Sequence, residues 1–349
     1  MLKNIISFPN LGLGPFEIDP VAFTLFGKKD VVWYGVIIMI GIICGVSYVM
    51  HRAKKEKLLE DDVLDYALIV VLTAILFARL YYVIFDPTPN YNTLLSVFAI
   101  WEGGLAIYGG IIGGALAVFL VCKWKKVYFA RFADMICPAV MIGQIIGRWG
   151  NFTNGEAYGS VVKFDFLFWS FDLSSSAIDN PFLMILNGRL AQPTFLYESL
   201  WNLVGLLIIV FVINRRRIFA GMTALSYFAW YGFGRMIIEG LRTDSLYIPG
   251  SETMRVSQLI GFFTFVFSVV AIVVFSIRAK AHPFDESAPV YYGDGLKKLK
   301  QMTEIDAEEP ANGSSCDIEA SGNVDDEEKT SEDDSENESE NENKEEGQK

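Results

Sequence analysis

The chain has 349 residues, of which 52% are hydrophobic, and its mean hydropathy is +0.33 although it ends in a long polar stretch. The formal net charge of -12 resides in that stretch, since residues 304–349 hold 19 Asp and Glu against 3 Lys and leave the rest of the chain at about +4. These numbers exclude an ordinary soluble domain and favour a membrane protein with an acidic tail, and four cysteines without metal-ligand spacing exclude a disulfide framework.

Seven apolar stretches follow one another along the chain, and the residues before the first lack the pattern of a signal peptide. A helix that crosses a bilayer core needs roughly 20 apolar residues. The stretches that reach or approach this length are Val31–Met50, Leu64–Phe85, Ala99–Cys122, Phe132–Arg148, Phe195–Ile213, Met222–Leu241 and Val256–Ile277. The sequence therefore predicts an all-α, polytopic membrane protein with about seven transmembrane helices.

Lysine and arginine are concentrated in alternate loops. They follow the first, third, fifth and seventh stretches, at Arg52–Lys57, Lys123–Arg131, Arg215–Arg217 and Arg278–Lys280. The loop Asp86–Val97, after the second stretch, has no positive charge. Because basic loops stay on the cytoplasmic side of a membrane, the pattern predicts an N-terminus outside and a C-terminus inside.

The chain divides into three predicted regions. Residues 1–280 form the membrane domain with an extracytoplasmic loop at about 151–194, residues 281–302 form a juxtamembrane linker, and residues 303–349 form the acidic tail. The tail has almost no apolar residues, so we expect it to be a disordered cytoplasmic extension. Five aromatic residues lie between Phe164 and Phe171 in the loop. They fit an interfacial lid and an ordinary folded loop equally well.

Ionisable residues occur inside or at the ends of the apolar stretches. Each costs about 2.5–3.5 kcal/mol on insertion scales, so such residues usually serve a purpose. They are Arg79, Glu102, Arg148, Glu156, Glu198, Arg235 and Glu239, with Arg242 and Asp244 just beyond. In the predicted topology all of them lie toward the extracytoplasmic side. This distribution predicts one polar cavity that opens outward.

The spacing of these residues indicates what the cavity binds. Arg148, Asn151 and Asn154 recur at every third position, which places them on one helical face if the helix continues. Arg235 and Glu239 can pair across one turn, and a buried structural ion pair explains those two equally well. A structural ion pair explains Arg148 less well, because its neutral Asn neighbour does not compensate the charge. Arginines in excess of carboxylates predict an anionic ligand, and the planar guanidinium suits phosphate.

Glycines are dense around the same positions. Gly109-Gly110 and Gly113-Gly114 have the small-xxx-small spacing that lets two helices approach closely. From Gly143 to Gly159 the glycines are denser than helix packing requires. We expect them to let the backbone turn or break where it lines the cavity.

Several motifs together resemble one family. The run Gly147-Arg-Trp-Gly-Asn-Phe-Thr-Asn-Gly-Glu-Ala-Tyr-Gly159 is similar to the signature of bacterial prolipoprotein diacylglyceryl transferases. Other landmarks of that family occur in the same order, namely Trp33-Tyr34-Gly35, Arg79, Trp101-Glu-Gly-Gly-Leu, Tyr108-Gly-Gly, Gln192-Pro-Thr-Phe-Leu-Tyr-Glu198 and the segment Tyr231–Arg242. The resemblance covers roughly Phe8–Ile277 and leaves the acidic tail outside.

The resemblance implies a seven-helix enzyme of the bacterial cytoplasmic membrane. Such an enzyme transfers the sn-1,2-diacylglyceryl group of phosphatidylglycerol to the lipobox cysteine of a prolipoprotein, forms a thioether and releases glycerol phosphate. Its partners are these two substrates and membrane lipid, with no nucleic acid, and neither a metal nor an organic cofactor is expected. The anionic donor lipid agrees with the excess of arginine, and both substrates reach the extracytoplasmic leaflet.

The resemblance also assigns roles to individual residues. The implied substrate-binding residues are Arg148, Asn151, Asn154, Tyr34 and Arg79, and the implied catalytic residues are Arg235, Glu156, Glu239, Tyr108 and Gly159. Arg148 would bind the headgroup, and Arg235 with Glu239 would stabilise the leaving phosphate. Many members of the family have histidine where this chain has Tyr108. Since tyrosine is a poor base at neutral pH, we expect Tyr108 to act as a hydrogen-bonding group.

Other classes of membrane protein offer competing interpretations. Transporters also carry intramembrane charges and broken helices, although the run Gly147–Gly159 has no second copy here. An intramembrane protease lacks support, because the sequence has no HExxH motif, no paired membrane aspartates and no convincing Ser/His set. A structural scaffold does not explain why the polar groups gather on one side of the membrane.

Overall fold

The computed structural model describes residues 3–26, 29–86, 91, 93–174, 179–251, 253–281, 284–285 and 288–312. Most of them lie in a bundle of long helices: α1 (Trp33–Glu56), α2 (Glu60–Phe85), α4 (Ile107–Trp124), α5 (Phe129–Asn154), α6 (Thr194–Ile208), α7 (Met222–Ile238) and α8 (Val256–Ala279). Helix α6 continues through one π and one 3₁₀ turn to Arg216. Each of the seven predicted apolar stretches corresponds to one of these helices, so the prediction of a mostly helical membrane protein is confirmed.

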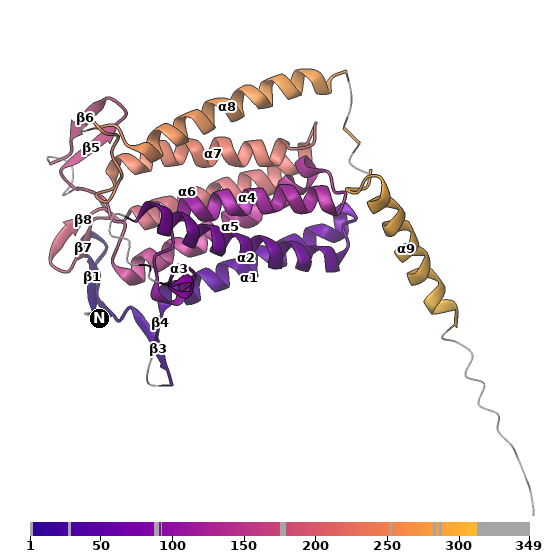
Figure 1. Ribbon diagram of the computed structural model, residues 1–349. Coiled ribbons are helices and arrows are strands. Elements are labelled where there is room, and N and C mark those ends of the chain that lie inside the picture. The colour runs from indigo at the N-terminus through magenta and orange to yellow at the C-terminus, as the bar shows by residue number, and fades with distance from the viewer. Residues whose placement is uncertain are drawn as a thin grey trace, which may run out of the picture. The chain divides into compact units, whose positions relative to one another are not determined.

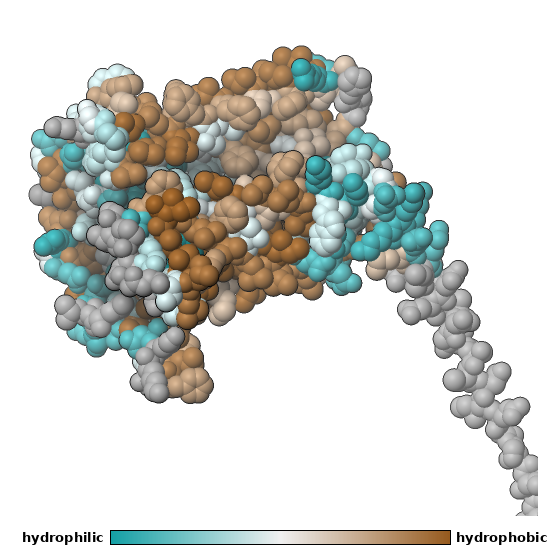
Figure 2. All heavy atoms as spheres, viewed as in Figure 1, coloured by the Kyte–Doolittle hydropathy of each residue, from teal (hydrophilic) through white to brown (hydrophobic). Residues whose placement is uncertain are grey.

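The helices coincide with long apolar runs, because such a run makes all of its backbone hydrogen bonds internally when it is helical. Six are long and apolar enough to cross a bilayer, whereas α7 has 17 residues and continues as a 3₁₀ turn, Glu239–Leu241. Figure 2 shows a broad apolar band over the bundle, with hydrophilic side chains toward its two ends. The band identifies a multi-pass membrane protein. The number of seven crossings and the orientation of the chain stay predictions.

Helix α5 lies at the centre of the packing. It packs along α1, α6 and α7, while α4 packs against α2 and α8 packs against α7 (Figure 1). The glycine prediction is confirmed between α2 and α4, because a Cβ atom at Gly109 or Gly113 would collide with Phe77 of α2. These glycines therefore serve close helix contact.

In the described part of the chain, eight short strands lie at one end of the bundle, which we call the sheet end (Figure 1). One sheet has the order β2-β1-β7-β8, and two hairpins are formed by β3 with β4 and by β5 with β6. Their bounds are β1 (Asn4–Phe8), β2 (Leu13–Ile18), β3 (Val21–Leu25), β4 (Lys29–Val32), β5 (Lys163–Phe166), β6 (Trp169–Asp172), β7 (Met184–Leu186) and β8 (Arg189–Ala191). The all-α prediction missed them, because strands of three to six residues fall outside the long apolar runs that identify membrane helices. Four of the described pairings are local, and one, β1 with β7, joins segments about 180 residues apart, as in Ile6 opposite Leu186.

Two predicted helix boundaries were wrong, and glycine explains both. The third stretch was expected to be helical from Ala99, but α4 begins at Ile107, after a 3₁₀ turn Ile100–Glu102 and two glycines with positive φ. The fourth was expected to end at Arg148, in a glycine-broken run. Instead α5 continues to Asn154 and ends at Gly155, whose φ of +63° is the left-handed conformation that glycine favours.

The predicted juxtamembrane linker is partly folded at the opposite end of the bundle. The backbone N–H of Tyr128 donates to Val290 O at 3.0 Å, and the buried Tyr291 hydroxyl donates to Asp62. Helix α9 (Asp294–Asn312) follows and extends into the first residues of the predicted tail, whose disorder stays a prediction. Leucines at 296 and 299 give this helix an apolar side that packs on the bundle core. The rest of the predicted tail, residues 313–349, lies outside the described residues.

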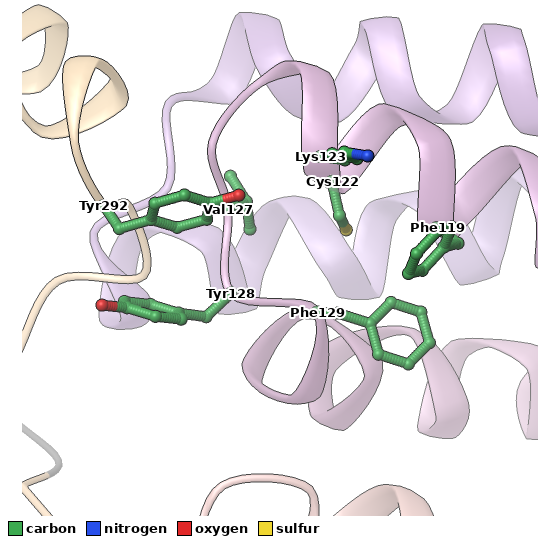
Figure 3. Close-up of a pocket in the computed structure, with 7 residues that line it drawn as sticks. All are labelled: Phe119, Cys122, Lys123, Val127, Tyr128, Phe129 and Tyr292. Atoms are coloured by element: carbon green, nitrogen blue, oxygen red, sulfur yellow. The ribbon is translucent and has the colours of Figure 1, made fainter.

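A cavity of about 270 Å³ also lies at this opposite end, near the turn between α4 and α5. Figure 3 shows its lining, in which the ring of Tyr292 faces that of Tyr128 and a phenylalanine pair closes the other side. None of the predicted site residues lines this cavity. A much smaller hollow of about 10 Å³ at the sheet end adjoins Asn151 and Glu156.

Candidate active site

The centre of the site is a carboxylate shared between two arginines from different helices. Glu198 lies in the second turn of α6 and is 2% exposed. One of its oxygens accepts a hydrogen bond from Arg148 of α5, and the other accepts one from Arg235 of α7 at 3.3 Å. Both arginines approach from the sheet end of the bundle, so Glu198 joins three helices at one point.

The network continues beyond the end of α7. Arg235 forms an ion pair with Glu239 at 2.7 Å, and Arg242 lies 3.9 Å from the same carboxylate. Arg242 also donates two hydrogen bonds to Asp244, at 3.0 and 2.8 Å. Burial alone would raise the pKa of Asp244, but the hydrogen bonds and charge of Arg242 outweigh it and hold that pKa below its ordinary value.

The expectation that Arg148 lacks a counter-charge was wrong, and so was the expectation of excess arginine. Arg148 is paired with Glu198, which lies 50 residues away in the sequence, and three arginines of the network face three carboxylates. The charges are nevertheless layered. The side chains of Arg148 and Arg235 are 18% exposed, whereas those of Glu198 and Glu239 are 3% and 2% exposed. Around Glu198 and Glu239 an anion therefore meets guanidinium groups before carboxylates, whereas the outer pair is reversed, with Asp244 49% exposed and Arg242 12% exposed.

The predicted helical face next to Arg148 is confirmed. Because α5 continues to Asn154, the side chains of Asn151 and Asn154 both reach Glu156, donating to one of its oxygens at 3.1 and 3.4 Å. The turn at Gly155 brings Glu156 back over the end of the helix. Asn151 also accepts a long hydrogen bond of 3.4 Å from Arg148. The amides thus connect the arginine network to Glu156.

Tyr34 joins this group from the first turn of α1. Its ring packs on Gly150 so closely that a Cβ atom there would lie 2.6 Å from Tyr34 Cδ2. Its hydroxyl lies within electrostatic range of Glu156, Arg148 and Arg242. The structure therefore brings together Tyr34, the α5 residues and the charged residues of α6 and α7.

Tyr108 lies at the start of α4, on the other side of the arginine network. Its hydroxyl is 3.1 Å from Ser257 Oγ of α8, and either oxygen can be the donor. It also lies within electrostatic range of Arg235. The hydroxyl is thus hydrogen-bonded, and its part in a reaction stays a prediction.

Arg79 lies at the sheet end but uses its donors elsewhere. Its guanidinium donates to the backbone oxygens of Ser96, Val97 and Gly103 at 2.8, 2.9 and 2.6 Å, and the residue is 3% exposed. These bonds hold the loop between α2 and α4. The geometry gives Arg79 a loop-holding role, and its predicted contact with a substrate stays a prediction.

Gly159 joins backbone segments rather than side chains. It exchanges two backbone hydrogen bonds with Gln192, at 2.8 and 2.9 Å, and also pairs with Arg242. A Cβ atom at this position would lie 2.8 Å from Thr194 Cγ2 and 3.0 Å from Gln192 Cβ. Only glycine fits without displacing the start of α6, which carries Glu198.

We therefore expect Gly159→Val to lower both the stability and the activity of the protein, although Gly159 has no side chain of its own at the site. Overpacking usually costs about 1–3 kcal/mol, and here it would shift α6 relative to α5. The thermal midpoint and the activity of the purified variant should both fall. Gly35→Val is a suitable comparison, since Gly35 is exposed in α1, has no positive φ, and no atom lies within 4 Å of a Cβ there. Wild-type behaviour of Gly159→Val would show that the close approach is unimportant.

Two central residues received no role in the sequence interpretation. Glu198 and Arg242 were noted as charges, but nothing local reveals that Glu198 bridges two helices. The available signal was a carboxylate in an apolar helix without a cation one turn away, since its neighbours at positions 194, 195, 201 and 202 are uncharged. A buried carboxylate without a local partner needs one from another element.

The arrangement suits the binding of an anion whose charge grows during a reaction. Arginine N–H groups on the exposed side can bind phosphate oxygens, while the buried carboxylates fix the guanidinium orientations in advance. Within the described part of the chain, no group of three or more His, Cys, Asp or Glu is placed to hold a metal ion.

Comparison with known proteins identifies relatives of the chain. A family model described as prolipoprotein diacylglyceryl transferase matches residues 20–274. The chain is similar to the phosphatidylglycerol–prolipoprotein diacylglyceryl transferase of Streptococcus sanguinis, with 41% identity over 273 residues that cover 77% of this chain and 100% of that protein. The enzymes of the same name from Streptococcus uberis and Streptococcus pneumoniae are 41% and 43% identical over 76% of this chain and 98% and 96% of their own lengths.

Proposed function

The chain belongs to the prolipoprotein diacylglyceryl transferase family, and from this premise we propose that it transfers the diacylglyceryl group of phosphatidylglycerol to a prolipoprotein. The acceptor is the thiol of the lipobox cysteine, and the products are a thioether and glycerol phosphate. The observation that carries the proposal is that the partly exposed guanidinium groups of Arg148 and Arg235 lie over the buried carboxylates of Glu198 and Glu239. The substrate is an anionic lipid, and such a surface binds its phosphate.

The reaction is a displacement at carbon. The sulfur forms a bond to the terminal glyceryl carbon that carries the phosphate, and the bond from that carbon to the phosphate oxygen breaks. The electron pair of the broken bond passes to glycerol phosphate, so negative charge grows on the phosphate oxygens. The thiol proton leaves the sulfur, and the phosphate monoester is basic enough to take it up. Stabilising the growing charge is thus the main task for the protein.

In this proposal the residues of α5 would hold the lipid headgroup. Arg148 would bind the phosphate through N–H groups that do not contact Glu198. Asn151, Asn154 and Glu156 offer donors and acceptors that suit the hydroxyl groups of glycerol. Tyr34 would orient the same headgroup through its hydroxyl, which lies within electrostatic range of Arg148 and Glu156.

The residues at the end of α7 would meet the leaving phosphate. Arg235 is held from two sides, by Glu198 and by Glu239, and so needs little reorganisation when charge develops. Its positive charge would also lower the pKa of an approaching thiol and so favour the thiolate nucleophile. Arg79 and Gly159 would support the reaction by holding the backbone around these groups.

The proposed setting is the bacterial cytoplasmic membrane, with the site at the extracytoplasmic leaflet. The positive loops between the helices support this orientation, because they lie at the end of the bundle opposite the sheet end. An acceptor cysteine that follows the apolar stretch of a signal peptide would reach the same leaflet. Both substrates would then arrive from the lipid.

Purified protein with labelled phosphatidylglycerol and a lipobox peptide tests the function directly. We expect the label on the peptide and a stoichiometric release of glycerol phosphate. A peptide with serine in place of the lipobox cysteine should stay unlabelled. No transfer under conditions that support a Streptococcus relative would contradict the proposal, and lipid movement without peptide labelling would favour a transporter.

Tyr108→Phe tests the hydroxyl that faces Ser257. A hydrogen bond of this kind contributes about 1 kcal/mol to stability, so we expect a slightly lower thermal midpoint and a transfer rate that falls only modestly and does not stop. Ser257→Ala should have a similar effect, because it removes the other half of the same bond. A rate of zero for Tyr108→Phe with normal thermal stability would assign the hydroxyl an essential role in proton transfer.

A further inference from the structure

Arg255 is a buried arginine outside the network that nevertheless contacts its backbone. It is the residue before α8 and is 1% exposed. Its guanidinium donates to the carbonyl oxygens of Glu239 and Arg242, the latter at 2.7 Å, and to Ser245 Oγ at 3.2 Å. It also pairs with Asp165 at 2.7 Å. One side chain therefore donates hydrogen bonds to the backbone of two charged residues that follow the end of α7, Glu239 and Arg242.

Asp165 reaches this place from the β5–β6 hairpin. Its carboxylate, fully buried, accepts hydrogen bonds from Arg255 and, at 2.7 Å, from Ser170 Oγ. Burial alone would raise the pKa of Asp165, but these hydrogen bonds and the nearby Lys163 hold it below its ordinary value. Its backbone oxygen accepts from Gln258 at 2.7 Å and lies so close to Gly240 that any side chain there would collide with it. The hairpin is thereby fixed against the turn Glu239–Leu241.

The end of α7 needs such support. The last carbonyl groups of a helix have no partner within it, and a cation at that end also meets the negative end of the helix dipole. Arg255 donates to two carbonyl groups just beyond this end, those of Glu239 and Arg242, of which Glu239 O also accepts from the backbone N–H of Arg242 at 3.1 Å. Burying an ion pair usually contributes little to stability, because desolvating both groups is costly. The buried pair of Arg255 and Asp165 lies beside the turn that carries Glu239. Its role is thus better explained by holding this turn in position than by adding to the stability of the fold.

We propose that Arg255 and Asp165 are positioning residues of the transfer reaction, which hold the turn that carries Glu239 and Arg242 and, through Glu239, keep Arg235 where it meets the leaving phosphate. The inference rests on the proposed function. In this arrangement the β5–β6 hairpin is part of the site's framework, since it supplies the counter-charge that keeps Arg255 in place. Neither residue touches the substrate, and both act through the backbone of the turn Glu239–Leu241 and of Arg242.

Two variants test the proposal through steady-state kinetics. Asp165→Asn removes the counter-charge, and Arg255→Lys keeps the positive charge but loses the fork that reaches two carbonyls and Asp165 at once. We expect kcat to fall at least tenfold in each, while KM for phosphatidylglycerol stays within threefold, because Arg148 and the amides of α5 are untouched. A merely structural role would lower the amount of folded enzyme and not the turnover of each folded molecule.

The Arg242→Lys background provides a second readout. If Asp165 acts through Arg242 and Glu239, Asp165→Asn should cost less than threefold when added to Arg242→Lys. Asp62→Asn is the matched control, since Asp62 is a buried, ion-paired carboxylate at the opposite end of the bundle. Its effect should be on thermal stability and should add independently to that of Arg242→Lys.

The outcomes are distinct. A folded Asp165→Asn enzyme with wild-type kcat, or an effect that stays equally large in the Arg242→Lys background, would overturn the positioning role. Loss of the folded protein in both Asp165→Asn and Arg255→Lys would overturn it as well, because the pair would then serve the fold alone. An inactive wild-type protein would instead contradict the proposed function and leave these comparisons without a reference.

Discussion

Replacing Arg148 with alanine should reduce diacylglyceryl transfer by at least about 10²–10³-fold, the usual loss when one preorganised donor to a developing anion is removed. The fold should survive, because Glu198 keeps its other partner, Arg235, at 3.3 Å. The variant leaves no buried carboxylate without a cation. Transfer from labelled phosphatidylglycerol to a lipobox peptide measures the loss, and the thermal midpoint of the purified protein measures the fold.

The chemistry of arginine makes the test sharper. Arg148→Lys retains the charge but cannot bind Glu198 and a phosphate through one planar fork, so we expect it to recover only part of the activity. Arg189→Ala is the control, since Arg189 is an exposed arginine of β8. Substantial transfer by a folded Arg148→Ala enzyme would refute the headgroup role, whatever the behaviour of the lysine variant.

The helices could be predicted from sequence because each is encoded locally. A run of about 20 apolar residues is helical in a membrane whatever its neighbours are, since every backbone hydrogen bond is made within the run. The strands at the sheet end are different. Ile6 pairs with Leu186, and neither segment shows by itself which partner it has. Such long-range pairing can be recognised only when the three-dimensional arrangement is known.

The site was predictable to the extent that its residues share one helix. The spacing of Arg148, Asn151 and Asn154 gave their common face, because helical periodicity fixes it. The counter-charge of Arg148 was not predictable, since Glu198 lies on another helix. Spacing also could not distinguish Arg79, whose donors bond loop carbonyls, from the arginines of the network. An intramembrane charge marks an end of the bundle, and only its partners show what it does there.

Glu198→Gln should have the most informative effect of any change in the network, because it separates binding from turnover. The substitution removes the charge that Arg148 and Arg235 share, and breaking a buried pair in this way costs about 3–5 kcal/mol of stability. We expect a lower thermal midpoint and a loss of turnover of about 10²-fold or more, as two guanidinium groups lose their fixed orientation. Glu17→Gln, which affects an exposed ion pair, should cost no more than about 1 kcal/mol.

Phosphatidylglycerol should partly restore what Glu198→Gln removes. Without the carboxylate, the positive charges of Arg148 and Arg235 are no longer compensated by Glu198. The lipid phosphate should therefore bind the variant more tightly than the wild type. A ligand that binds the folded state stabilises it in proportion to the logarithm of its concentration over Kd. Adding phosphatidylglycerol should therefore raise the thermal midpoint more in Glu198→Gln than in wild type. An uncharged diacylglycerol should change the thermal midpoints of the two proteins by the same amount. An equal shift in both proteins would mean that the two arginines do not face the headgroup, and the phosphate would have to bind elsewhere at the sheet end.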